Sequence, residues 1–297
     1  MKTLPRISIV TPSYNQTVYI EETICSVLEQ GYPNLEYIIV DGGSTDGSVE
    51  IIRKYEKHLA WWVSEKDNGQ PHAINKGWRR STGDVLGWLC SDDLLTPGAL
   101  NSVADQFERS AVDWVTGATE LFDANGFRRI VMPRTDLLRL WVDRARLVRG
   151  YSFGQPSTFI RRRLFEAVGV LNESLHYSFD HEYWCRARLV GFEPTTIAEV
   201  LSSYRLHEKS KTCTAREMFC VEDGRVYESL KSQLSSTDRL LNWIDRNRLS
   251  AIEGFCQQSL VKPDWRELFA LAVKNPWMLT IRPFWGSVRK SGVEVRN

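Results

Sequence analysis

One stretch of the sequence decides the fold: Thr82-Gly83-Asp84-Val85-Leu86-Gly87-Trp88-Leu89-Cys90-Ser91-Asp92-Asp93-Leu94-Leu95-Thr96-Pro97-Gly98. Its apolar run, from Val85 to Cys90, is bounded by turn residues, which is typical of a strand buried on both faces. Asp92 and Asp93 follow, and Thr96-Pro97 has the hydroxyl cap and early proline of a helix start. Ligands of open α/β sheets bind at the carboxyl ends of strands, so we expect the acid pair at a ligand site. The alternative is a polar turn that only closes the strand.

Strand and helix patterns alternate from the first residues to about Glu108. Strands are expected at residues 7–10, 35–40 and 61–63, and helices at 19–30, 48–57 and 72–80. This alternation predicts an α/β fold in which a mostly parallel sheet is flanked by helices.

The pattern changes after Asp113. The elements expected there are a hairpin around Asn125-Gly126, an amphipathic helix at 135–148, strands at 156–160 and 195–205, and a helix that opens at Ser178. Only helical patterns follow Thr214. We therefore expect a catalytic domain at residues 1–212 and a helical C-terminal appendage at residues 213–297.

Composition and charge are those of an ordinary globular protein. The formal charge of +1 over 297 residues gives no reason to expect a nucleic acid partner. The six cysteines form no C-x-x-C pair, so reduced thiols are expected in place of disulfides or a zinc site. We find no signal peptide and no apolar stretch that could cross a bilayer, and we expect a cytoplasmic protein.

Every early strand ends in polar, turn-forming residues. The ends at 11–15, 41–46, 67–70 and 91–93 converge on one crevice, because parallel strands present their carboxyl ends at one edge. The glycine-rich turn at 42–47 lacks the lysine of a phosphate-binding loop. Its carboxylate, Asp41, is better suited to accept hydrogen bonds from a nucleobase or ribose. The alternative is that Asp41 only stabilises its own turn.

Four motifs in this order resemble the family 2 glycosyltransferases of the GT-A fold. They are Thr11-Pro12-Ser13-Tyr14-Asn15, Val40-Asp41-Gly42-Gly43-Ser44-Thr45-Asp46, Asp67-Asn68-Gly69-Gln70 with Ala73-Ile74-Asn75-Lys76-Gly77, and Ser91-Asp92-Asp93 with Pro97-Gly98. The resemblance covers roughly residues 5–212. It implies a nucleotide-diphosphate-sugar donor, whose diphosphate is held through Mn²⁺ or Mg²⁺, the hard cations that carboxylates and phosphates suit.

The resemblance also implies roles for individual residues. Asp93 would bind the metal, and Asp92 would contact the ribose or the waters of the metal. The other expected donor-binding residues are Pro12, Ser13, Tyr14, Asp41, Gly69 and Lys76. The family's Gln-x-x-Arg-Trp motif of processive polysaccharide synthases is absent from the sequence, so addition of a single sugar is expected.

Asp180 is the expected catalytic base. The run Asp180-His181-Glu182-Tyr183-Trp184-Cys185-Arg186 is similar to a family pattern in which an acidic residue opens a helix. An inverting transfer needs a carboxylate that takes the proton of the acceptor hydroxyl. Alternatively, Asp180 only complements the helix dipole. Glu182 is the second candidate base, and His181 is expected to pack beside the base.

His207 and Lys211 follow the last predicted strand. Similar proteins end the domain with a comparable Arg-x-His segment, which implies that His207 completes the metal shell. Lys211 could neutralise charge on the leaving diphosphate. The alternative for His207 is a solvated loop histidine.

The tail at residues 274–297 carries five Lys or Arg and three large aromatic residues against a single Glu. Together with the arginine-rich helix expected at 135–148, it resembles a surface that binds anionic lipid. Many similar enzymes extend polyprenyl-diphosphate-linked glycans, so we expect a peripheral protein at the inner face of the plasma membrane. The alternative is that these aromatics pack the tail onto the domain.

These observations together predict an inverting glycosyltransferase that adds one sugar to a glycan or lipid-linked hydroxyl. A sugar-phosphate nucleotidyltransferase is one alternative, but it would need a basic, glycine-rich loop after the first strand. A catalytically degenerate sugar-nucleotide-binding protein is the non-enzymatic alternative, and slow hydrolysis of a nucleotide sugar would separate the two.

Overall fold

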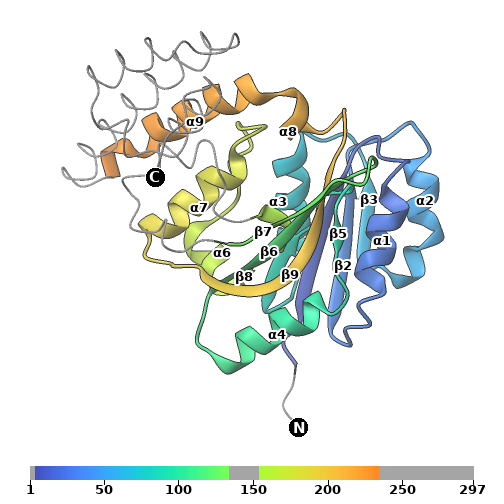
Figure 1. Ribbon diagram of the computed structural model, residues 1–297, viewed down its shortest axis with the longest axis horizontal. Helices are drawn as coiled ribbons and strands as arrows, with labels where there is room; N and C mark the ends of the chain where they lie inside the picture. The colour runs from blue at the N-terminus through green and yellow to red at the C-terminus, as the bar shows by residue number, and fades with distance from the viewer. Residues whose placement is uncertain (1–3, 134–153, 234–297) are drawn as a thin grey trace, which may run out of the picture. The chain divides into compact units, whose positions relative to one another are not determined.

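The computed structural model describes residues 4–133 and 154–233, which all belong to one compact unit. A curled sheet lies at its centre, with helices on both faces (Figure 1). The strands are β1 (Ile7–Ser13), β2 (Leu35–Asp41), β3 (Trp61–Ser64), β4 (Val85–Trp88), β5 (Leu94–Leu95), β6 (Trp114–Asp123), β7 (Arg128–Val131), β8 (Thr158–Arg161) and β9 (Thr195–Leu206). The α-helices are α1 (Ile20–Leu28), α2 (Ser48–Lys54), α3 (Gln70–Arg80), α4 (Ala99–Arg109), α6 (Arg162–Val168), α7 (Phe179–Leu189), α8 (Lys211–Thr214) and α9 (Arg216–Leu230).

The strand order is β3-β2-β1-β4-β8-β6-β9-β5, and β7 pairs with β6. The first four of these strands are parallel, as the alternation of strands and helices predicted. The strand order reverses direction between β1 and β4, and open α/β sheets bind their ligands outside the carboxyl ends of the strands at such a switch point. The acid pair Asp92-Asp93 follows β4 at this switch point, so its predicted place after a central strand is confirmed.

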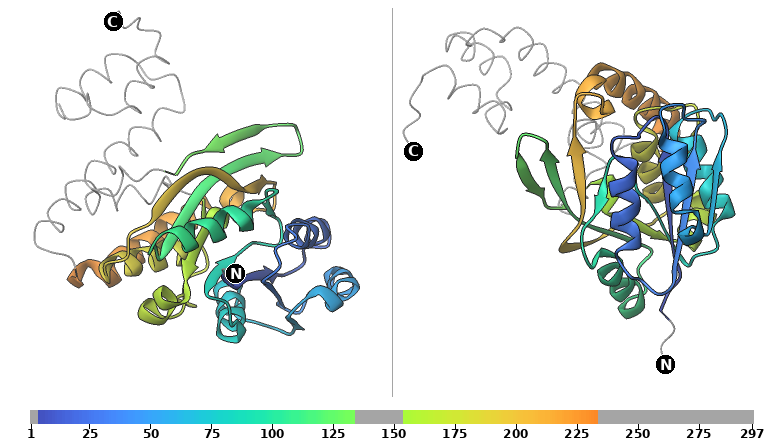
Figure 2. Two further views of the ribbon diagram at one scale, coloured as in Figure 1. Left: turned by 90° about the horizontal axis from the view of Figure 1, so that it is seen from below. Right: turned by 90° about the vertical axis from the view of Figure 1, so that its right-hand side faces the viewer.

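The second half of the sheet is mixed. Strand β8 is antiparallel to both β4 and β6, and β6 is parallel to β9. The predicted hairpin is present as β6 and β7, and it extends away from the rest of the sheet (Figure 2). Both the parallel strands of the first half and the parallel pair β6 and β9 are joined by connections that contain helices, as parallel pairing requires.

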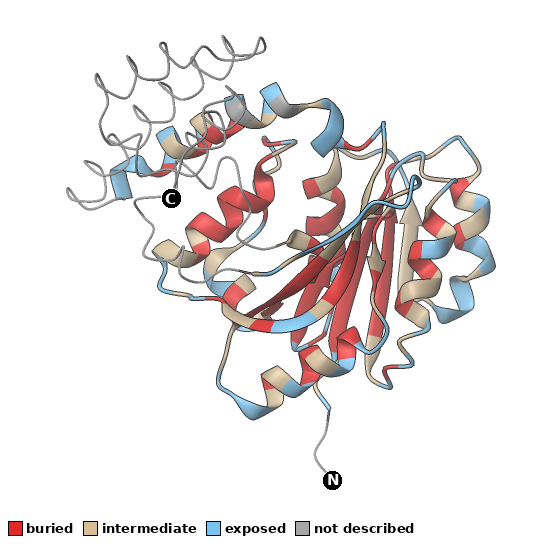
Figure 3. Ribbon diagram, in the orientation of Figure 1, coloured by how far each residue is buried: buried red, intermediate tan, exposed pale blue. Residues whose placement is uncertain are grey.

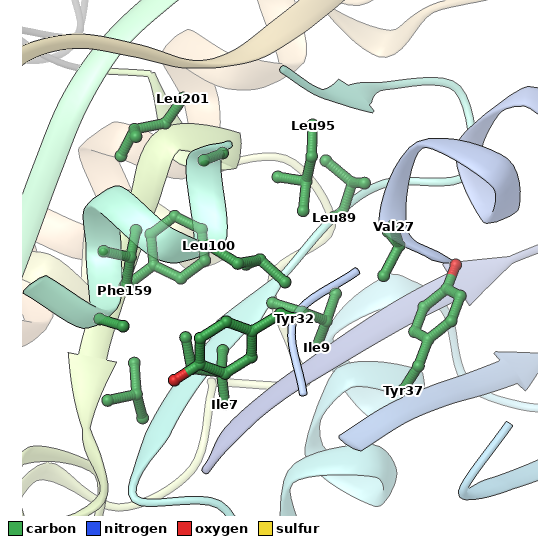
Figure 4. Close-up of a cluster of buried hydrophobic side chains, with 14 of the residues drawn as sticks. Ile7, Ile9, Val27, Tyr32, Tyr37, Leu89, Leu95, Leu100, Phe159 and Leu201 are labelled. Carbon is green, nitrogen blue, oxygen red and sulfur yellow. The ribbon is translucent and has the colours of Figure 1, made fainter. Parts of the chain in front are cut away.

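Each face of the sheet is covered by its own buried cluster. Residues of α1, α2 and α4 pack on one face, in a buried cluster that includes Val27, Leu100, Leu201 and Ile9 (Figure 4). Residues of α3, α6, α7 and α9 pack on the other. The central strands are accordingly buried along most of their length (Figure 3).

One predicted helix start differs from the structure. Helix α4 begins at Ala99, after Gly98 in the left-handed region (φ 80°), and not at Thr96-Pro97. The Thr96 hydroxyl donates a hydrogen bond to the carbonyl of Val200 on β9. Thr96 therefore ties the end of β5 to β9 and does not cap the helix.

The C-terminal part of the chain packs on the catalytic region as far as it is described. Val226 and Leu230 of α9 belong to the same buried cluster as α7. The division at residue 212 stays a prediction. The helix expected at 135–148 and the tail from 234 to 297 lie outside the described residues. Within residues 4–133 and 154–233, no helix is long and apolar enough to cross a bilayer.

Gly77 provides a test of how closely α3 packs on β1. A Cβ atom at this position would lie 2.4 Å from Cγ1 of Val10. We expect Gly77→Ala to lower the free energy of unfolding by about 1–3 kcal/mol, the usual cost of overpacking. Gly224→Ala in α9, where a Cβ meets nothing within 4 Å, is the matched control and should raise it by up to about 1 kcal/mol. Urea unfolding measures both, and a Gly77→Ala protein as stable as the parent would contradict this packing.

Candidate active site

Asp93 is held from two sides, just after the end of β4. Its carbonyl accepts a hydrogen bond from the Thr23 hydroxyl of α1 (2.9 Å), and its Oδ1 accepts one from the backbone N–H of Arg205 (3.0 Å). The side chain is only 1% exposed, yet its Oδ2 has no hydrogen-bond donor among the described residues. A buried carboxylate oxygen without a partner is costly, so this atom is an open ligand position.

The charge state of Asp93 supports the same conclusion. Burial and the neighbouring charge of Asp92 raise the pKa of Asp93 well above its usual range. The hydrogen bond and charge of Arg205 act in the opposite direction without restoring the ordinary value. Two adjacent carboxylates in a buried site remain ionised together only when a positive charge meets them. A bound divalent cation would provide that charge.

The donor set around Asp93 suits a hard divalent cation. Nε2 of His207 lies 3.0 Å from Oδ2 of Asp92, and the place of His207 in a metal shell stays a prediction. Ligand atoms of Cys90, Asp92 and Asp93 all lie within 4.8 Å of one another. Carboxylate oxygens are the ligands that Mg²⁺ and Mn²⁺ prefer, and imidazole is acceptable to Mn²⁺. The residues present therefore fit a metal site of the predicted kind.

Arg205 is the arginine of the Arg-x-His segment, and it shapes the site although the sequence analysis gave it no role of its own. Its Nε donates to the carbonyl of Asp92 (2.9 Å), and its guanidinium pairs with Glu22 and lies over the rings of Tyr19 (4.9 Å) and Phe122 (4.6 Å). The available signal was spacing: Arg205 lies near the end of β9 and His207 directly after it, and residues two apart in an extended chain share one face.

A chain of polar side chains, also missed, runs beside the acid pair. Gln70 Nε2 donates to Cys90 Sγ (3.0 Å), the thiol donates to Gln155 Oε1 (3.7 Å), and Gln155 Nε2 donates to the Trp88 carbonyl (3.0 Å). Burial raises the pKa of the Cys90 thiol, so it stays protonated at neutral pH. Lys211 extends this chain, because its Nζ donates to Gln70 Oε1 (3.1 Å).

The residues predicted to bind the nucleoside lie at the ends of β1 and β2. Ser13 pairs in register with Asp41, and the buried Ser13 Oγ has no partner among the described residues. Tyr14 follows β1 and is 62% exposed. Asp41 is fully buried and accepts hydrogen bonds from the N–H groups of Gly43 (3.1 Å) and Ser44 (2.8 Å). The turn-stabilising role considered for Asp41 is thus present, and Pro12 is buried in β1 beside it.

Gly69 and Lys76 lie in different surroundings. Gly69 adopts a φ of 103° directly before α3, and its N–H donates to Asp67 Oδ1 (2.8 Å). Lys76 lies further along α3 and forms an ion pair with Glu65 (2.6 Å). The ion-pair partner of Lys76 in the structure is therefore Glu65 and not Asp92 or Asp93.

Asp180 lies in the first turn of α7 and is 8% exposed. Its Oδ1 accepts a hydrogen bond from the N–H of His181 (2.7 Å), as expected for an acidic residue at a helix start. Its charge also raises the pKa of Cys90, so it is within electrostatic reach of the end of β4. Glu182 accepts two hydrogen bonds from Arg186, at 2.8 and 3.0 Å, which leaves it less suited to be the base.

His181 is buried behind the candidate base. Burial alone would lower its pKa, but Cys185, Asp223 and Asp180 outweigh burial and raise the pKa of His181 to about 9. The imidazole Nε2 lies 3.7 Å from Cys185 Sγ. This agrees with the predicted packing position beside Asp180.

The sequence profile of Glycosyl transferase family 2 matches residues 8–169, more than half of the chain. The chain belongs to glycosyl transferase family 2. An uncharacterized glycosyltransferase of Rickettsia typhi is 29% identical to this family member over 71% of the chain and 67% of the relative. TuaG of Bacillus subtilis, named for teichuronic acid biosynthesis, is 40% identical over 38% of the chain and 46% of its own length. The chain thus spans less than half of TuaG.

Solved glycosyltransferases share the fold. TarS of S. aureus, in complex with UDP-GlcNAc, has a TM-score of 0.60 at 17% identity, covering 79% of this chain and 69% of that one. The mannosyltransferase PcManGT of Pyrobaculum calidifontis, in complex with GDP-Man and Mn²⁺, has a TM-score of 0.53 at 19% identity, covering 92% and 87%. The predicted GT-A fold is confirmed. Membership of this family argues against the nucleotidyltransferase alternative.

Proposed function

We propose that this family 2 glycosyltransferase is an inverting enzyme that moves one sugar from a nucleoside-diphosphate sugar to an acceptor hydroxyl. The proposal rests on one observation, the open and buried Oδ2 of Asp93 beside Asp92 and His207. This atom lies at the switch point of the sheet, where α/β proteins bind nucleotides.

The donor would lie along the carboxyl ends of β1, β2 and β4. Ser13, Tyr14 and Asp41 would meet the nucleoside, and the acid pair would face the diphosphate. A Mn²⁺ or Mg²⁺ ion bound there would supply positive charge to the leaving diphosphate. The Lys211 ammonium donates a hydrogen bond to Gln70 at the start of α3, and it would add a second positive charge on that side. A structural neighbour that binds GDP-Man and Mn²⁺ supports this choice of donor and metal.

Asp180 would act as the general base. Its carboxylate takes the proton of the acceptor hydroxyl while that oxygen attacks the anomeric carbon, on the side opposite to the departing diphosphate. A displacement of this geometry inverts the anomeric centre. Glu182, the other acidic residue in the first turn of α7, already forms an ion pair with Arg186, which makes it the weaker candidate for this role.

The test of this role is Asp180→Asn. Thermal stabilisation by UDP-, GDP- or dTDP-sugars with Mn²⁺ first identifies the donor, since a ligand of the folded state raises its stability. The variant should still bind that donor, while turnover falls by about 10²–10⁴-fold, the usual contribution of a general base. Asp105→Asn, an exposed residue of α4, is the control and should keep full turnover.

Two outcomes would contradict this proposal. Loss of donor binding with retained turnover would make Asp180 a binding residue. Donor binding by the parent protein without any hydrolysis or transfer would instead favour the degenerate sugar-nucleotide-binding protein.

The acceptor we propose is a glycan or a polyprenyl-diphosphate-linked sugar used in cell-envelope polysaccharide synthesis. The name of the relative TuaG supports this class of product. The basic, aromatic tail would hold the cytoplasmic enzyme at anionic lipid on the inner face of the plasma membrane. This part of the proposal rests on sequence alone, because residues 134–153 and 234–297 are outside the described structure.

Liposome binding tests the proposed membrane surface. The full chain should co-sediment with vesicles of anionic lipid at low salt and be released at high salt, because salt screens surface charges. Removal of residues 274–297 should weaken this binding. If both proteins stay in the supernatant equally at low salt, the tail has no such role.

A further inference from the structure

A single carboxylate of α9 accepts hydrogen bonds from the backbone just before α7, the helix that carries the candidate base. Glu222 accepts hydrogen bonds from the N–H groups of His176 (2.8 Å), Tyr177 (2.7 Å) and Ser178 (2.9 Å). The Glu222 residue is 3% exposed, so these bonds are shielded from water. Three consecutive donors therefore converge on one buried acceptor that comes from more than forty residues further along the chain.

One of these bonds, to the N–H of Ser178, serves the residue directly before α7. Ser178 precedes α7 and makes no capping hydrogen bond with its own side chain. The N–H groups at a helix start have no partner within the helix and need one from elsewhere. Helix α9 lies beside α7, and Glu222 satisfies donors of the segment that leads into it (Figure 1). A negative charge there also complements the positive end of the helix dipole.

Residues 176–178, the segment that Glu222 binds, also lie against the loop before α3. The carbonyl of His176 accepts a hydrogen bond from Lys211 Nζ (2.8 Å), and the same ammonium donates to Gln70 Oε1. A Cβ at Gly69 would lie 3.2 Å from Nδ1 of His176, so the imidazole packs directly on this glycine. Residues 176–178 thus lie between α9, the loop before α3 and the first turn of α7.

Asp180 follows Ser178 by two residues, so its position depends on how that segment is held. We propose that Glu222 is a positioning residue for sugar transfer, which fixes the start of α7 and thereby aims Asp180 at the acceptor hydroxyl. The kinetic part of this proposal rests on the proposed function, whereas the anchor itself does not. The proposal gives α9, which follows residue 212, a part in the reaction.

Glu222→Gln is the decisive variant. A carboxamide keeps the size of the side chain but loses its charge and one acceptor oxygen; with its oxygen in the place of Oε2, which serves Tyr177 and Ser178, its NH₂ group would face the N–H of His176. Glu222→Asp keeps both acceptor oxygens on a shorter side chain and should rescue part of the effect. Glu217→Gln, an exposed residue of the same helix, is the matched control.

Two measurements are made on the full chain. Hydrogen exchange of the peptide that holds residues 176–178 should be about tenfold faster in the Gln variant, because its amides open locally. Turnover should fall by about tenfold to a hundredfold with the donor KM unchanged, since a small displacement of a catalytic group costs this much. The control should match the parent in both respects. A merely structural role would lower turnover and donor affinity together.

Unchanged exchange in the Gln variant would overturn the anchor, and faster exchange with unchanged turnover would overturn the positioning role. If the Gln variant does not fold, the Asp variant decides by the same two criteria. A parent protein without turnover on any nucleotide sugar contradicts the proposed function, and exchange at residues 176–178 then still decides the anchor.

Discussion

The candidate site depends on the pairing of two short pieces of chain that are far apart in sequence. Leu94 and Leu95 of β5 pair with Ser203 and Ser202 of β9. This pairing fixes the residues on either side of it, so Asp93 meets the backbone of Arg205 and Asp92 meets His207. Strand β4 alone would present an acid pair to solvent. Closure by β9 buries Asp93 and places His207 beside Asp92.

Burial is what gives the acid pair its chemical use. In water, two neighbouring carboxylates are solvated and bind a divalent cation weakly, whereas in this site Asp93 has an open oxygen and a raised pKa. Other parts of the fold hold Asp93 in place through hydrogen bonds that leave its Oδ2 open for a ligand. Thr23 of α1 and the backbone of Arg205 hold Asp93 from opposite sides. A cation and a diphosphate would then enter a site whose ligands are already positioned.

The sequence predicted those parts of the molecule that carry a local signal. The first strands, the acid pair at the end of β4, the hairpin and helix α7 all have a period, a turn or a motif. Thr96 was assigned to a helix cap because nothing local shows that Val200 lies beside it. The same is true of the two-residue strand β5, of the Gln70-Cys90-Gln155 chain and of Glu222. Each is defined by a contact across 20 to more than 100 residues, which leaves no pattern in a single sequence.

Anomalous scattering from Mn²⁺ in crystals grown with a nucleoside diphosphate tests the central claim, that the buried acid pair is a metal–diphosphate site. The account predicts one strong peak within coordination distance of Oδ2 of Asp93 and of the diphosphate oxygens, with His207 close to it. A nucleotide bound in the crevice with no Mn²⁺ peak at Asp93, or with the peak at other residues, would contradict it.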